Sequence, residues 1–429
     1  MSRIVLTTIG SAGDLFPFLS IAHELRARGH EVVFAANPWF EEPIAHEGFS
    51  FVGLGPWLGP DEYAMWPEIL EPRGGGLPAL RTLMERFVLP HLEQVTRELH
   101  AVVGPGDLLL THPAQLAAPM VAELGGVRWG TLSVFPGNLP SRDHPPQGMP
   151  RLPLPGALSA RANEAGWALA RRTMRSAFDP ELNRIRQRVG LPPGRDLFLL
   201  SGLSPDLVLM LCPAAYCEPS RDWPDQVRCV GYTLFDTPRD WQDPPELDEF
   251  LDGGEAPVLV CLGVSVAMHA GEFVQQTLDA LARAGARGLF LVGRAPNVPS
   301  RAPRGNAFFP YVPLSRVLDR VRLVVHPGGF GTTAAVVRAG VPSIVVPRAF
   351  DQAYHARRLV ELGLGYRHGG SRIRPGRLSG QIARAGGDTE LLRRCASFAT
   401  RVAGDGSGAA CDAIEQTLLG HPRGLPEHP

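Results

Sequence analysis

Residues 325–333 read Val-His-Pro-Gly-Gly-Phe-Gly-Thr-Thr and join an apolar, strand-like run, 321–325, to a stretch with helical spacing that ends at Gly340. Glycines let the chain turn tightly and let a ligand approach the backbone closely. The first amide groups of a helix have no partner within it, and with the helix dipole and the hydroxyls of Thr332 and Thr333 they attract an anion. The segment therefore predicts a cradle suited to a diphosphate or, as the alternative, a tight strand-to-helix turn capped by the threonines.

Around this turn, short apolar runs typical of buried strands alternate with stretches of helical spacing. The expected strands are 3–9, 31–36, 107–111 and 128–134 in the first half, and 257–262, 288–292, 321–325 and 343–346 in the second. The expected helices are 16–28, 114–124, 272–284 and 331–339. This alternation predicts β-α-β units, and therefore an α/β fold with parallel sheets covered on both faces.

Residues 216–255 interrupt the alternation, because prolines stand there among charged residues without sustained periodicity. Proline cannot continue a helix or an inner strand, so this stretch is expected to connect two lobes. The predicted domains are a Rossmann-like lobe at 1–215, a proline-rich linker at 216–255 and a second Rossmann-like lobe at 256–429. Ligands of such sheets bind beyond the carboxyl ends of the strands and in the cleft between lobes.

Two further groups of polar residues follow expected strand ends. Residues 9–17 read Ile-Gly-Ser-Ala-Gly-Asp-Leu-Phe-Pro and place Asp14 at the head of a helix. An aspartate there either caps the helix, which stabilises it by about 1 kcal/mol, or projects from the turn as a catalytic group. The turn lacks the G-x-G-x-x-G pattern, which argues against a dinucleotide. Asp351 and Gln352, after the strand at 343–346, are suited to bind sugar hydroxyls or simply begin another helix.

The composition excludes several classes of function. The chain has 429 residues with 42 basic and 43 acidic side chains, and none of the basic ones is lysine. The missing lysine excludes a Schiff-base lysine, a pyridoxal-phosphate anchor and a Walker A motif. The near-neutral balance predicts that nucleic acid is not a partner.

The sequence contains no motif typical of a metal site among its histidines and cysteines. No apolar run reaches the roughly 18 residues of a transmembrane span. The first residues form a strand-like run rather than a signal peptide. We therefore expect a cytoplasmic protein without a metal, a cofactor or a transmembrane segment, and leave open whether it is a homodimer.

Together these motifs resemble nucleotide-sugar glycosyltransferases of the GT-B fold in the UDP-glycosyltransferase superfamily, especially bacterial natural-product and rhamnolipid-type enzymes. The residues that carry the resemblance are Gly10–Pro17, Thr111–Pro113, His326–Pro342 and Phe350–Gln352. The resemblance implies two Rossmann-like lobes that face a cleft, with the acceptor on the first lobe and the nucleotide sugar on the second. It implies an inverting, metal-independent transfer of a hexose or deoxyhexose from a UDP- or dTDP-sugar to a hydroxyl of an apolar small molecule.

The resemblance also implies roles for single residues. Asp14 matches the general base, which removes the proton of the acceptor hydroxyl, and His112 is a candidate to orient Asp14 or touch the acceptor. The expected donor ligands are Ser265, His326, Gly328, Gly329, Gly331, Thr332, Thr333, Asp351 and Gln352. The aromatic residues Trp57, Trp66 and Phe87 are candidates for an apolar acceptor wall. A structural role for His112 and plain packing of the aromatic residues stay open as alternatives.

Two residues depart from the family's pattern. Pro327 stands where relatives commonly have a histidine that donates to the diphosphate, and Ala335 stands where they often have Glu or Gln on the ribose. Each missing hydrogen bond costs donor binding on the order of 1–3 kcal/mol, unless an arginine such as Arg294 or Arg348 replaces it. The alternatives are therefore an acceptor-binding pseudo-glycosyltransferase with a degenerate donor site and a non-hydrolysing sugar-nucleotide epimerase. The sugar, the nucleotide, the acceptor and the regiochemistry are open.

Overall fold

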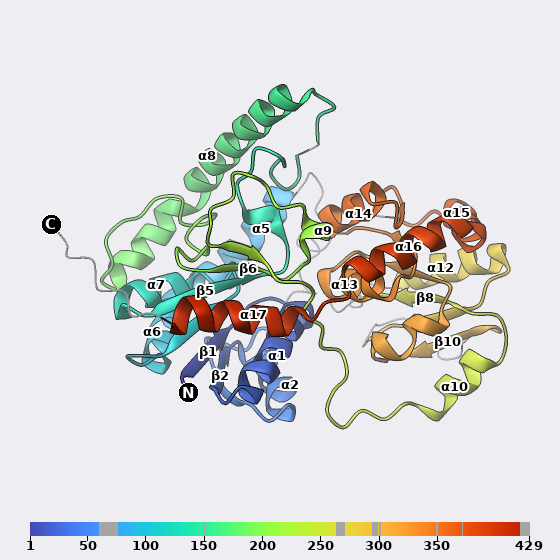
Figure 1. Ribbon diagram of the computed structural model, residues 1–429, viewed down its shortest axis with the longest axis horizontal. Coiled ribbons are helices and arrows are strands. Elements are labelled where there is room, and N and C mark those ends of the chain that lie inside the picture. The colour runs from blue at the N-terminus through green and yellow to red at the C-terminus, as the bar shows by residue number, and fades with distance from the viewer. Residues whose placement is uncertain are drawn as a thin grey trace.

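The computed structural model describes residues 1–59, 76–149, 151–262, 271–293, 299, 302–348, 351–370 and 372–420. Within them the strands form two separate parallel sheets, which lie in the left and right halves of Figure 1. The predicted α/β fold with two Rossmann-like halves is confirmed. The sequence pattern located the inner strands because their residues are apolar on both faces, and Ile4, Val5 and Leu6 of the first strand are indeed fully buried.

The first sheet has the strand order β3-β2-β1-β4-β5-β6-β7 and the second has the order β10-β9-β8-β11-β12-β13. The strands of the first sheet are β1 Arg3–Thr7, β2 Glu31–Ala36, β3 Ser50–Gly53, β4 Leu108–Thr111, β5 Arg128–Ser133, β6 Val208–Met210 and β7 Val227–Cys229. Those of the second sheet are β8 Val258–Cys261, β9 Gly288–Leu291, β10 Asn306–Phe309, β11 Leu323–His326, β12 Ser343–Val345 and β13 Gly365–Arg367. In each sheet the strand order reverses beside the first strand, and ligands bind at such a point.

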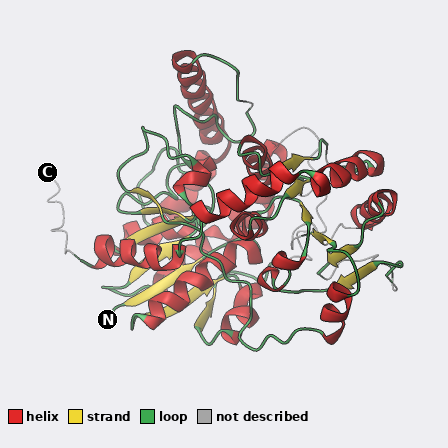
Figure 2. Ribbon diagram, turned by 45° about the vertical axis from the view of Figure 1, so that its right-hand side comes forward, coloured by secondary structure: helices red, strands yellow, loops and turns green. Residues whose placement is uncertain are grey.

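Helices cover both faces of the sheets (Figure 2). In the first half and the connecting region they are α1 Ala12–Ala27, α2 Glu41–His46, α5 Gly76–Leu83, α6 Leu89–Val102, α7 Ala117–Gly125, α8 Gly156–Arg188, α9 Ala214–Cys217 and α10 Pro245–Asp252. In the second half they are α12 Gly271–Ala284, α13 Phe330–Ala339, α14 Gln352–Glu361, α15 Pro375–Gly387, α16 Thr389–Arg401 and α17 Gly406–Ile414. None of the described helices is both long enough and apolar enough to span a membrane.

The predicted linker, 216–255, contains regular structure. It includes β7, which pairs with β6 at the edge of the first sheet, and the short helix α10. Proline-rich flanks tolerate an edge strand because only one of its sides needs hydrogen-bond partners. The division of the chain into domains stays a prediction, while the first sheet itself extends to Cys229.

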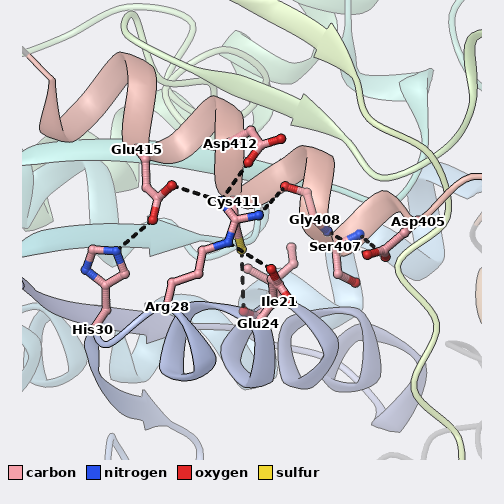
Figure 3. A network of polar contacts seen from close by, with 10 residues as sticks. All are labelled: Ile21, Glu24, Arg28, His30, Asp405, Ser407, Gly408, Cys411, Asp412 and Glu415. Carbon is pink, nitrogen blue, oxygen red and sulfur yellow. Dashed lines mark hydrogen bonds and ion pairs between the residues drawn. The ribbon is translucent and has the colours of Figure 1, made fainter.

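The last helix, α17, returns from the second half and packs on α1 of the first (Figures 1 and 3). Arg28, at the end of α1, joins them: its Nη1 lies 2.6 Å from Asp412 Oδ1 and 2.8 Å from Glu415 Oε2, and its Nη2 donates to the Gly408 carbonyl at 3.1 Å. His30 adds a contact to Glu415 at 3.0 Å. The two halves are therefore held together by the end of the chain as well as by the connector.

The long helix α8 is an element that the apolar alternation did not predict. It has 33 residues, and one of its ends projects well beyond the body of the molecule in Figure 1. Its buried residues include Trp167 and Phe178, which are three helical turns apart and mark the face turned toward the first half. The spacing of these two apolar residues was the signal in the sequence from which the helix could have been predicted.

Candidate active site

A cleft of about 2350 Å³ lies between the two sheets. Its walls include the segments that follow β1, β4, β11 and β12, so it opens at the carboxyl ends of the strands, as expected for such sheets. A pocket for one small ligand typically has roughly 300–1,000 Å³. The cleft is therefore large enough for two substrates at once.

Asp14 occupies the third position of α1 and forms a reciprocal cap with Ser11. The Ser11 amide donates to Asp14 Oδ2 at 2.7 Å, and the Ser11 hydroxyl contributes a second bond at 3.2 Å. Gly10 has φ = +114°, and a Cβ there would lie 2.3 Å from Asp14 Oδ2, so the turn needs glycine to admit the carboxylate. One oxygen of Asp14 therefore caps the helix, which confirms that part of the interpretation, while the side chain still lines the cleft.

His112 follows β4 and points toward the other oxygen of Asp14. Its Nε2 lies 3.8 Å from Asp14 Oδ1, while its Nδ1 accepts a hydrogen bond from the Ala114 amide at 3.2 Å. Because Nδ1 is an acceptor, the hydrogen of the neutral ring is on Nε2. Burial lowers the pKa of His112 to about 4. At neutral pH the ring is therefore uncharged and presents an N–H group toward the carboxylate.

The electrostatic environment raises the pKa of Asp14 from 3.8 to about 6. Burial of the carboxyl group is the largest cause, and the negative charge of Asp351 on the other side of the cleft adds to it, while the bonds from Ser11 act in the opposite direction. A carboxylate with a pKa near the operating pH is well suited to accept a proton.

The turn before α13 adopts the predicted strand-turn-helix geometry. Gly328 has φ = +96°, and a Cβ there would lie 2.6 Å from Val345 Cγ1. Gly329 begins the helix, and added Cβ atoms at Gly329 and Gly331 would meet nothing within 4 Å. The cleft therefore lies directly over this backbone, where the first amide groups of the helix have no partner within it. Gly340, with φ = +71°, ends the helix as expected.

The predicted donor residues of this turn divide into two groups. Gly329, Gly331 and Thr332 line the cleft. His326, Gly328 and Thr333 do not, and the side chains of His326 and Thr333 are 0% and 1% exposed. Burial lowers the pKa of His326 to about 3, so its ring is uncharged. The geometry supports direct contact with a ligand for the first group, and a role in shaping the turn for the second.

Asp351 and Gln352 both line the cleft at the start of α14. The carboxylate of Asp351 makes no capping bond to its own helix and instead lies 3.2 Å from His355 Nε2. Gln352 Oε1 accepts a hydrogen bond from the Arg348 amide at 2.8 Å, so this oxygen is already engaged. Both side chains are therefore accessible to a ligand that binds on the side of the second sheet.

The cleft also contains the two residues that depart from the family's pattern, Pro327 and Ala335. Three arginines also line the cleft, Arg338, Arg348 and Arg367. Of the three, only Arg348 was expected from the sequence to take part in donor binding. These guanidinium groups provide positive charge in the cleft.

The wall on the side of the first sheet is mostly apolar. Trp57 and Phe87 line it, with Trp57 half exposed and Phe87 buried, and their contact with an acceptor stays a prediction. Helix α8 contributes Trp167 and Met174, which the sequence analysis did not single out. Aromatic and thioether side chains of this kind suit an irregular, apolar ligand.

Four of the predicted or candidate residues lie outside the described residues: Ser265, Trp66, Arg294 and Phe350. Among the residues that are described, no group of three or more histidine, cysteine or acidic side chains is arranged to hold a metal ion.

Comparison with known proteins agrees with this fold. Residues 4–97 match the glycosyltransferase family 28 N-terminal domain, and residues 293–410 match the C-terminal domain described as erythromycin biosynthesis protein CIII-like. The crystal structure of the glycotransferase of kitacinnamycin superposes with a TM-score of 0.73 at 21% identity, covering 97% of this chain and 99% of that one. The Streptomyces sp. SF2575 glycosyltransferase SsfS6, complexed with thymidine diphosphate, has a TM-score of 0.66 at 22% identity, covering 97% and 100%.

The sequence relatives establish the class of protein. O-mycaminosyltylonolide 6-deoxyallosyltransferase of Streptomyces fradiae is 34% identical over 383 residues, which cover 85% of each chain. An aligned length of 383 residues is too long for either half of the molecule alone, so the similarity extends into both. The chain therefore belongs to the family of bacterial natural-product glycosyltransferases with the GT-B fold, in which a family 28 N-terminal domain is joined to an erythromycin biosynthesis protein CIII-like C-terminal domain.

Proposed function

We propose that this glycosyltransferase moves a hexose or deoxyhexose from a UDP- or dTDP-sugar to a hydroxyl of an apolar small molecule, with inversion at the anomeric carbon. The observation that carries the proposal is that Asp14 and the start of α13 line one cleft from opposite sheets. The Streptomyces fradiae relative is named as a 6-deoxyallosyltransferase of O-mycaminosyltylonolide, and a solved neighbour holds thymidine diphosphate. Both support a sugar linked to a nucleoside diphosphate as the donor.

In the proposed reaction, Asp14 accepts the proton of the acceptor hydroxyl while that oxygen attacks the anomeric carbon. The bond from this carbon to the diphosphate oxygen breaks on the opposite face, and the configuration is therefore inverted. Asp14 Oδ1 is the oxygen that faces the reacting groups, because Oδ2 caps its own helix. The N–H group of His112 orients this carboxylate from 3.8 Å away.

The leaving diphosphate carries the negative charge that develops during the reaction. The amide groups at the start of α13 and the Thr332 hydroxyl are proposed to stabilise it, which is supported by the position of Gly329, Gly331 and Thr332 on the wall of the cleft. Arg338, Arg348 and Arg367 add positive charge to the cleft. We therefore propose that transfer needs no metal ion and no cofactor beyond the nucleotide sugar. Asp351 and Gln352 are proposed to bind the sugar hydroxyls.

The acceptor is proposed to lie against the apolar wall that contains Trp57, Phe87, Trp167 and Met174. Each of these side chains offers apolar area and little hydrogen-bonding capacity. The size of the cleft suits a bulky acceptor such as a polyketide or a lipid-like natural product.

A ligand screen tests the proposal. Thermal unfolding is measured with UDP, dTDP, GDP and NAD(P), and we expect UDP or dTDP to raise the midpoint because ligands that bind only the folded state stabilise it. Release of the nucleoside diphosphate is then measured with UDP- and dTDP-sugars, with and without apolar acceptors, and the anomeric configuration of the product is determined by NMR. A pseudo-glycosyltransferase would gain no stability from nucleotides, and an epimerase would convert the donor without an acceptor.

A further inference from the structure

Asp351 stands at the start of α14 but does not cap that helix. Its backbone is already helical, with φ = −66° and ψ = −16°, so its side chain is not placed to accept bonds from the first amide groups. Here the side chain instead faces the cleft and His355, one turn farther along α14. The helix itself therefore does not fix the orientation of this carboxylate.

His355 has both ring nitrogens beside polar groups, although its side chain is only 1% exposed. Its Nε2 lies 3.2 Å from Asp351 Oδ2, and its Nδ1 lies 2.8 Å from the hydroxyl of Tyr216. Tyr216 is fully buried, and burial raises its pKa well above the ordinary range, so the phenol keeps its hydrogen. A buried hydroxyl donates where an acceptor is available, and the acceptor here is His355 Nδ1.

This bond determines the tautomer of the ring. With Nδ1 as an acceptor, the hydrogen of the ring is on Nε2, which lies close to Asp351 Oδ2 but outside hydrogen-bond geometry with it or with any other described group. The opposite tautomer would place two lone pairs against each other at 3.2 Å. Tyr216, His355 and Asp351 thus form a line of neighbouring polar groups from the core to the cleft, in which the contact between Tyr216 and His355 is a hydrogen bond and that between His355 and Asp351 is a close electrostatic approach.

The same helix is fastened to α9 by a second residue. Arg358 donates through Nε to the Tyr216 carbonyl and lies 2.8 Å from Glu218 Oε1. Tyr216 is therefore held at its backbone by Arg358 and at its hydroxyl by His355. Because α9 follows β6 of the first sheet, these contacts fix the start of α14 relative to the half of the molecule that contains Asp14.

We propose that His355 is a positioning residue, which holds the Asp351 carboxylate toward the donor sugar, and that Tyr216 sets its tautomer. The inference rests on the proposed contact between Asp351 and the sugar. It assigns part of the recognition of the sugar to two buried residues that do not touch it. The opposing interpretation is that His355 only fills the core, where its ring packs against Phe330 and Tyr354.

The two interpretations differ in what a substitution does to the sugar and to the nucleotide. His355→Phe keeps an aromatic ring and removes both nitrogens. We expect KM for dTDP-glucose or UDP-glucose to rise about fivefold, because the ring nitrogen beside the Asp351 carboxylate is lost. Binding of dTDP or UDP, which lack the sugar, should change less than about twofold by calorimetry. His355→Gln, whose amide can donate from nearly the position of Nε2, should recover most of the loss.

His368 provides the matched control. It is buried in the same half, with Nδ1 2.7 Å from Gln381 Oε1 and Nε2 accepting from the Arg374 amide, and it does not line the cleft. His368→Phe should lower stability without raising the donor KM relative to dTDP or UDP binding. Equal weakening of donor and nucleoside diphosphate in His355→Phe, or no weakening of either, would overturn the inference.

Asp351→Asn separates this inference from the proposed function. If Asp351→Asn leaves the donor KM unchanged, the proposed sugar contact itself is wrong. If Asp351→Asn raises the donor KM and His355→Phe does not, only the positioning role is wrong. When both act through one contact, the double variant should be no worse than Asp351→Asn alone. If His355→Phe does not fold, Tyr216→Phe carries the test, with an expected rise of about threefold in donor KM.

Discussion

His112 Nε2 lies 3.8 Å from Asp14 Oδ1, at the ends of the adjacent strands β4 and β1. The other oxygen of Asp14 is engaged in the cap of α1. Capping and catalysis are alternatives when the turn is considered by itself, but the two oxygens of one carboxylate allow both. The cap holds the side chain in a single orientation, which is what a general base requires.

Replacing Asp14 tests its assignment as the base. Asp14→Asn is expected to lower kcat by 10²–10⁴-fold, the usual contribution of a general base. The amide still offers an oxygen to the Ser11 amide, so the cap and the donor site should survive. The measurement is single-turnover transfer together with dTDP or UDP affinity. Unchanged turnover would remove Asp14 from the mechanism.

The acidic limb of the pH profile is expected near pH 6. Asp14 must be deprotonated to accept a proton, and its pKa is raised from 3.8 to about 6. At saturating donor, kcat/KM for the acceptor should therefore fall about tenfold per pH unit below pH 6 and be level above it. Asp351→Asn removes a charge that raises this pKa, so the limb should move to lower pH. If the acidic limb of the Asp351→Asn profile stays near pH 6, Asp351 does not act on Asp14.

The same pKa has a consequence for stability. Because the pKa of Asp14 is higher in the folded chain than in the unfolded one, the folded state binds more protons between about pH 4 and pH 6. The ionised side chain is therefore least favourable above pH 6. Asp14→Asn should unfold at a higher temperature than the wild type at pH 8, and the difference should disappear below about pH 4. Thermal unfolding across this range checks the sign.

Thr332 and Thr333 are adjacent but differ in exposure to the cleft, and this provides a matched pair of variants. Thr332→Val removes a hydroxyl at the proposed diphosphate site, and we expect dTDP or UDP binding to weaken about fivefold, near 1 kcal/mol. Thr333→Val replaces a buried hydroxyl by a methyl group of the same shape and should bind the nucleotide as the wild type does. Calorimetry on both variants makes the comparison. Equal losses would place Thr333 in the donor site as well.

Pro327 lines the cleft, and it stands at the position where glycosyltransferases of this family commonly have a histidine. Pro327→His restores a side-chain donor and a backbone N–H, and we expect it to tighten dTDP or UDP binding by up to about tenfold. The same measurement on Ala335→Gln tests the part of the proposed donor site that would contact the ribose. A tenfold loss in Pro327→His would show instead that the turn is shaped around the proline.

Arg28 is expected to contribute to the stability of the whole chain. Its guanidinium joins α1 to Asp412, Glu415 and the Gly408 carbonyl of the last helix (Figure 3). Arg28→Ala leaves these groups without their shared donor and should lower the free energy of unfolding by about 1–2 kcal/mol. Arg393→Ala is the control, because its pair with Glu390 is fully exposed and should contribute little to stability. Denaturant unfolding of both variants measures the difference.

The amino-acid sequence was sufficient to predict the class of fold and the two turns at the cleft. Glycines at 10, 328 and 340 need backbone conformations that few other residues adopt, and buried parallel strands have an apolar pattern that is visible locally. The helix after each turn follows from the spacing of its own residues. Asp14, Thr332 and Asp351 could therefore be placed at strand ends before any coordinates were known.

Tertiary structure alone decided which of these side chains meet. His326 and Thr333 lie beneath the turn that Thr332 faces, because packing against neighbouring strands and helices, not spacing, sets the direction of a side chain. The bond between Tyr216 and His355 joins residues 139 positions apart, and no local pattern records such a contact. The charge of Asp351 likewise reaches Asp14 only because two sheets, each predictable by itself, face one another across the cleft.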